Sequence, residues 1–73
     1  MTEKELENTK RDLIYNLSYQ RKMLNYSQTE IAEELHTTQQ VISSIEKGKR
    51  TPNLEVLIKY ADVLGLKVIL VTK

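Results

Sequence analysis

Helix start and stop signals divide most of this chain into four helical segments, and this division constrains the fold more than any other feature. Within each segment, apolar residues recur at the 3.6-residue period of a helix. Asn25, Gly48 and Gly65 follow the first, third and fourth segments, and these residue types readily adopt the left-handed conformation that ends helices. The sequence therefore predicts an all-α chain with helices at about 3–24, 28–35, 39–47 and 54–64.

Capping residues stand before the last three predicted helices. Ser27 and Glu30 form the S-x-x-E pattern of a capping box. Thr38 and Asn53 precede the third and fourth helices, where a side-chain oxygen can accept a hydrogen bond from a free backbone N–H. Because only a few residues separate the second helix from the third, the sequence predicts two short helices joined by a tight turn.

The final segment, residues 66–72, departs from the helical period. It reads LKVILVT and is rich in β-branched residues, which is typical of a strand covered on both faces. The chain contains no second strand candidate, so a lone strand would leave its backbone groups unpaired. We therefore expect a homodimer in which this segment pairs with its copy across a two-fold axis, through Val68, Ile69, Leu70 and Val71.

Length and composition allow one small domain, residues 1–73, with its core in 13–65 and the dimerisation strand in 66–73. The chain has no cysteine and a single histidine, His36, so we expect neither a disulfide nor a metal site. It also lacks a glycine-rich phosphate loop and a nucleophile paired with a histidine base. We therefore expect no enzymatic activity, no cofactor and no small-molecule ligand.

The hydropathy pattern indicates a cytoplasmic protein with no membrane partner. The longest apolar run, residues 68–71, is far too short to cross a bilayer. The first eleven residues carry mixed charges and lack the apolar core of a signal peptide.

The predicted third helix has an outer face of amides and small hydroxyls. Glutamine can form two hydrogen bonds with adenine, and a helix N-terminus suits a groove lined by phosphates. Three basic residues, Lys47, Lys49 and Arg50, follow at its end. Taken alone, such a face is more typical of a solvated surface; together with the caps and the tight turn it favours nucleic-acid binding.

These segments resemble the Cro/C1-type helix-turn-helix family, also called the XRE family. The resemblance covers roughly residues 13–65 and depends on the S-Q-x-x-I-A pattern from Ser27, the T-T-Q-Q pattern from Thr37 and the I-S-x-I-E-x-G pattern that ends at Gly48. It implies a lambda-repressor-like domain that binds specific double-stranded DNA. The function implied is that of a transcriptional regulator, a repressor, acting as a homodimer on a palindromic operator.

The resemblance also implies roles for individual side chains. Base edges in the major groove would be contacted by Gln39, Gln40 and Ser44. The sugar-phosphate backbone would be contacted by Ser27, Gln28, Thr38, Ser43, Lys47, Lys49 and Arg50.

A structural ion pair is implied as well, because Arg21 matches an arginine that in this family pairs with the glutamate matched by Glu46. The residues themselves support a partner for Arg21. It shares the inward stripe of the first helix with Leu13 and Leu17, and a buried charge requires one.

One departure from the phage repressors suggests a second hypothesis. Those proteins continue with a fifth helix, whereas this chain continues with residues 66–72, which is similar to the antitoxins of the HigA and HipB type. The alternative is therefore an antitoxin that neutralises a cognate toxin protein and autoregulates its operon.

Overall fold

The computed structural model describes residues 1–73 and confirms the all-α architecture with four helices. Each helix ends one residue before the expected position, because the last expected residue is the C-cap: Leu24, Leu35, Lys47 and Leu64. The helices are α1 (Glu3–Met23), α2 (Gln28–Glu34), α3 (Gln39–Glu46) and α4 (Leu54–Val63). None of them is long and apolar enough to span a membrane.

The expected caps are present at the starts of α2, α3 and α4. The Ser27 hydroxyl accepts from the backbone N–H of Glu30, while the Glu30 carboxylate accepts from the backbone N–H of Ser27. Thr38 and Asn53 accept from the third residue of their own helices. Each cap satisfies a backbone donor that the helix itself leaves free.

Residues with positive φ end all four helices. Asn25, Gly48 and Gly65 have φ angles of 62°, 75° and 73°. His36, at 54°, plays the same part after α2 and turns the chain towards α3. A histidine in this conformation carries steric strain that a glycine would not.

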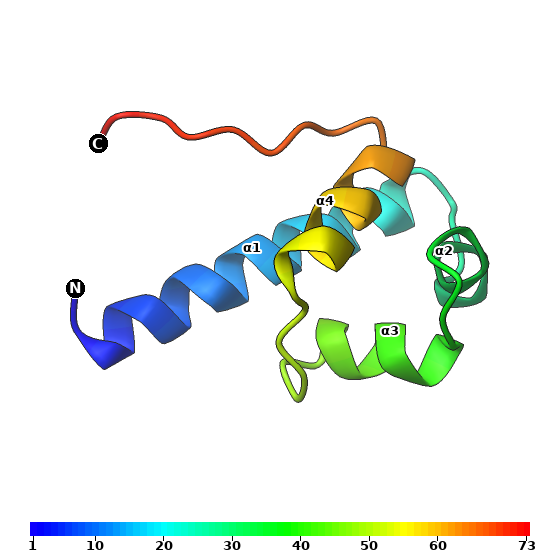
Figure 1. The fold of residues 1–73 in the computed structure, drawn as a ribbon, viewed down its shortest axis with the longest axis horizontal. Coiled ribbons are helices and arrows are strands. Elements are labelled where there is room, and N and C mark those ends of the chain that lie inside the picture. The colour runs from blue at the N-terminus through cyan, green and yellow to red at the C-terminus, as the bar shows by residue number, and fades with distance from the viewer.

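The core is formed by apolar side chains from all four helices. Its centre contains Ile31, Ile42 and Tyr60, each at most 1% exposed. The C-terminal half of α1 contributes Leu17, whereas the N-terminal half of α1 extends beyond the other helices (Figure 1). Burial of these side chains supplies the main driving force for folding.

The expected strand at residues 66–72 is not seen in the single chain. The backbone N–H of Leu66 bonds the carbonyl of Ala61, and no residue beyond it makes a backbone hydrogen bond. The segment leaves α4 as an extended, unpaired stretch (Figure 1). A strand requires a neighbouring strand for its backbone groups, and a single copy of this chain offers none.

Candidate nucleic-acid interface

The α2–α3 unit is the rigid support of the candidate interface. The turn between the helices is closed by a 2.9 Å hydrogen bond from the backbone N–H of Thr37 to the carbonyl of Ala32. Ile31 and Ala32 of α2 are buried in the same cluster as Ile42 of α3. Packing and turn together fix the direction of α3 relative to the body (Figure 1).

The opposite side of α3 faces solvent and is polar. Gln39 and Gln40 are exposed, and Ser43 and Ser44 are partly exposed. Val41 is half-buried, which agrees better with packing than with a free side chain. This face therefore presents amides and hydroxyls, which can donate and accept hydrogen bonds, and no carboxylate that would repel a phosphate.

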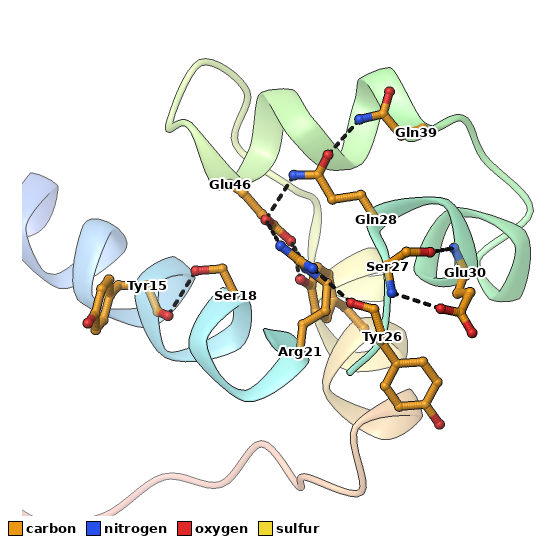
Figure 2. A network of polar contacts seen from close by, with 10 residues as sticks. Tyr15, Ser18, Arg21, Tyr26, Ser27, Gln28, Glu30, Gln39 and Glu46 are labelled. Carbon is orange, nitrogen blue, oxygen red and sulfur yellow. Dashed lines mark hydrogen bonds and ion pairs between the residues drawn. The ribbon is translucent and has the colours of Figure 1, made fainter. Parts of the chain in front are cut away.

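A buried ion pair joins α1 to the C-terminal end of α3 (Figure 2). Arg21 Nε lies 2.8 Å from Glu46 Oε2, and Arg21 Nη2 lies 2.9 Å from Oε1, which is bidentate geometry. The third guanidinium nitrogen, Nη1, donates to the backbone carbonyl of Tyr26 at 2.8 Å. The structure thus brings Arg21 and Glu46 together with both side chains more than 90% buried.

Two further donors complete the environment of Glu46. The Tyr60 hydroxyl of α4 donates to Oε2, and Gln28 Nε2 of α2 donates to Oε1 at 3.1 Å. The carbonyl oxygen of Gln28 in turn accepts from Nε2 of Gln39, the first residue of α3 (Figure 2). A continuous series of hydrogen bonds therefore leads from the core to the exposed N-terminus of α3.

The protonation states of this cluster follow from its contacts. Burial alone would raise the pKa of Glu46, but hydrogen bonds from Arg21, Tyr60 and Gln28 outweigh it, and the pKa lies below the usual value. The hydrogen bond to Glu46 raises the pKa of Arg21. Burial, followed by the bond to Glu46, raises the pKa of Tyr60. At neutral pH the cluster therefore contains one carboxylate, one guanidinium and one neutral phenol.

The α3–α4 loop presents the basic residues expected to meet phosphates. The backbone N–H groups of Lys49 and Arg50 both donate to the carbonyl of Ser44, at 2.9 and 3.2 Å, so the loop folds back on α3. The side chains of Lys47, Lys49 and Arg50 are exposed and form no ion pair. They are free to contact a polyanion.

A groove of about 650 Å³ lies between this loop and α1. Lys10 and Arg11 of α1 line it together with Lys47 and Arg50. Sequence reasoning did not connect these two pairs of cations, because nearly forty positions separate them along the chain. Glu7, which pairs with Lys10, and Glu46 also line the groove. The four cations exceed these two carboxylates, so an excess of positive charge remains beside the loop.

The remaining candidate residues divide into two groups. The hydroxyls of Ser27 and Thr38 already accept capping bonds, although each retains capacity for a further hydrogen bond. The side chains of Gln40, Ser43 and Ser44 make no hydrogen bond within the protein. Sequence reasoning also missed the role of Tyr60, because its bond to Glu46 joins residues of α4 and α3 that are fourteen positions apart.

Two short helices joined by a tight turn, the second with a free polar face, define the helix-turn-helix class. The comparisons with known proteins agree: residues 17–70 match the Helix-turn-helix family model, and the chain belongs to this family, in its Cro/C1 or XRE type. The resemblance inferred from the sequence is thereby confirmed, and family membership makes the chain a DNA-binding regulator.

A relative from Methanocaldococcus jannaschii is 38% identical over 52 residues, which cover 71% of this chain and 79% of that protein. It is named an uncharacterized HTH-type transcriptional regulator. No solved structure matches the chain.

Proposed function

We propose that this protein represses transcription by binding, as a homodimer, to a specific palindromic operator in double-stranded DNA. In each subunit α3 enters the major groove, and the two copies of α3 lie about 34 Å apart, one turn of the duplex. The observation that carries this proposal is the exposed amide-and-hydroxyl face of α3, held on the body by the buried Arg21–Glu46 pair.

The roles within the interface follow the chemistry of the exposed groups. Gln39, Gln40 and Ser44 contact base edges, because amides and hydroxyls match the donors and acceptors of the major groove. Phosphate contacts position the protein along the duplex and carry no sequence information themselves. We assign them to Ser27, Gln28, Thr38, Ser43, Lys47, Lys49 and Arg50.

The unpaired tail supports the homodimer. Residues 67–73 make no backbone hydrogen bonds, and the apolar side chains of residues 68–71 are exposed, Leu70 completely. Antiparallel pairing with a second copy would satisfy the backbone groups and cover these side chains at once. The proposed interface is therefore Val68, Ile69, Leu70 and Val71.

Selection of bound sequences from a random duplex pool, at a stated salt concentration, tests the proposal. The expected result is a single consensus with two-fold symmetry. Gln40→Ala should relax the preference at one position of each half-site and weaken binding to the best site by about 1–3 kcal/mol. A variant that keeps the full preference would contradict the role of Gln40.

Lys49→Ala is the matched control for a phosphate contact. It should weaken binding to all sequences alike and reduce the slope of log K against log salt by about one charge. The consensus should not change.

The exposed apolar tail also favours a second candidate, an antitoxin that uses this surface to bind a toxin protein and autoregulates its operon. Co-expression with a small protein encoded in the same operon tests this candidate. A stable complex and relief of growth inhibition would support it, and independent purification of the two proteins would exclude it.

A further inference from the structure

We propose that Tyr60, which lies in the core on α4, is a positioning residue for DNA recognition. Through Glu46 and Gln28 it sets the orientation in which Gln39 presents its side-chain amide to a base. The inference rests on the proposed function, since it assigns a specificity determinant to the same interface. It adds a residue that contacts neither DNA nor α3's outer face.

The first step is the saturation of the Glu46 carboxylate. Oε2 accepts from Arg21 Nε and the Tyr60 hydroxyl, and Oε1 accepts from Arg21 Nη2 and Gln28 Nε2. Two carboxylate oxygens offer about four lone-pair positions, and four donors occupy them. The donors come from α1, α4 and α2, so the carboxylate has one orientation in which all of them are satisfied.

The second step is the direction of the hydrogen bonds. An ionised carboxylate can only accept, so Gln28 must turn its NH₂ group towards Glu46 and its carbonyl oxygen outwards. That oxygen accepts from Gln39, which must therefore turn its own NH₂ group towards Gln28. The charge on Glu46 thus determines the orientation of two successive amides.

The third step concerns what Gln39 has left to offer. One N–H of its amide is used by Gln28, and one N–H and the carbonyl oxygen remain free. Adenine presents one acceptor and one donor, N7 and N6–H₂, in the major groove, whereas guanine presents two acceptors. The ordered amide therefore matches adenine and leaves guanine with only one donor.

Tyr60 is well placed to control this series. It is 1% exposed, and its hydroxyl donates to the same oxygen as Arg21 Nε. Removing only the hydroxyl leaves the aromatic ring in the core and the bidentate ion pair in place. The carboxylate then loses one of its four donors, and Oε2 keeps only Arg21 Nε. The position of Glu46 is therefore less tightly fixed, and with it the orientation of Gln28 and Gln39.

Tyr60→Phe tests the inference, with Tyr19→Phe on the exposed side of α1 as the matched control. The measured quantity is the affinity for the selected consensus divided by the affinity for a duplex in which the Gln39 base pair is changed from A·T to G·C. We expect this ratio to fall by about 3- to 10-fold in Tyr60→Phe, a part of what one bidentate contact provides. Tyr19→Phe should leave it unchanged, and neither variant should change the salt slope.

A double-mutant comparison separates positioning from general stability. In a Gln39→Ala background, Tyr60→Phe should cause no further loss of the ratio, because both changes act on the same contact. Gln28→Met interrupts the series at a partly buried position without touching Arg21 and should lower the ratio as Tyr60→Phe does. If Tyr60→Phe does not fold, Gln28→Met still tests whether this series of hydrogen bonds controls the affinity ratio.

Several results would overturn the inference. The affinity ratio of Tyr60→Phe or Gln28→Met could equal that of the wild type, or the affinity for both duplexes could fall equally. The losses of Tyr60→Phe and Gln39→Ala could also prove additive. Each of these results would contradict the inference and leave the proposed function intact. A wild-type protein that selects no sequence would instead refute the proposed function, and the inference with it.

Discussion

At the scale of single residues, Glu46 contributes both to the stability of the fold and to the candidate interface. Its carboxylate compensates the buried charge of Arg21, and it also faces Gln28 at the edge of the candidate interface. The first duty concerns folding and the second recognition. The two can be measured separately.

Arg21→Ala should destabilise the protein by about 3–5 kcal/mol, because it leaves the Glu46 carboxylate buried without its counter-charge. Urea unfolding followed by circular dichroism measures the change. Lys59→Ala is the control, since it breaks the exposed Glu55–Lys59 pair, and solvent screening leaves such pairs with little effect on stability. Similar effects of the two variants would show that the buried pair has no special weight.

Acid should destabilise the fold through Glu46. Its pKa in the folded protein lies below the ordinary value of 4.5, so the carboxylate stabilises the fold above that pH. The contribution is lost as the pH falls through the lower, folded-state pKa. Glu46→Gln should be less stable than wild type at pH 7, and the difference should narrow as the pH falls below about 4.5. Unfolding curves at pH 7, 5, 4 and 3 would show this narrowing, and a constant difference would contradict it.

High pH should destabilise the fold through Tyr60. Burial and the bond to Glu46 raise the pKa of Tyr60 above its ordinary value of 10.0, so the neutral phenol stabilises the fold below pH 10. As the pH rises above that value, the unfolded chain ionises first and stability declines. Tyr60→Phe should lack this decline in unfolding experiments between pH 9 and 11, whereas Tyr19→Phe should retain it.

Sequence reasoning reached some of these residues and not others. Arg21 could be singled out because a charge on an apolar stripe requires a partner. The hydroxyl of Tyr60 could not, since its bond to Glu46 forms only when the fold brings these residues of α4 and α3 together. Leu13 illustrates the reverse: it lies on the predicted inward stripe but is 42% exposed in the structure.

At the scale of elements, the helices were predictable because their limits are local. A cap needs one side chain and the next turn of backbone, so Ser27, Thr38 and Asn53 could be identified without any tertiary information. The tail could not be assigned in this way. Whether residues 66–72 form a strand depends on a partner that lies outside the single chain.

Gly48→Ala tests the left-handed residue that ends α3. The added methyl group would meet no atom within 4 Å, so the cost is that of the positive φ alone, about 1–2 kcal/mol. His36→Gly is the complementary change, since it removes a side chain from the same conformation, and should not be destabilising. Thermal unfolding of both variants measures the effects, and a stable Gly48→Ala protein would contradict this account.

At the scale of the whole molecule, the exposed tail governs the proposed oligomeric state. Leu70→Lys places a charge in the centre of the proposed strand pairing and should yield monomers in analytical ultracentrifugation. Leu54→Lys is the matched control, because Leu54 is also strongly exposed but lies on α4. If both variants remain dimeric, or if removal of residues 66–73 leaves the dimer intact, the tail is not the interface.

The hydrogen-bonded series that ends at Gln39 has a consequence for any attempt to retarget this protein. Gln28 bonds Glu46 of the buried ion pair, and Gln39 bonds Gln28, so exchanging Gln28 removes a donor from a buried charge and exchanging Gln39 removes the partner of Gln28. The side chains of Gln40 and Ser44 have no such attachment. A library that seeks new operator preferences should therefore randomise Gln40 and Ser44 first, because substitutions at these positions should destabilise the fold least.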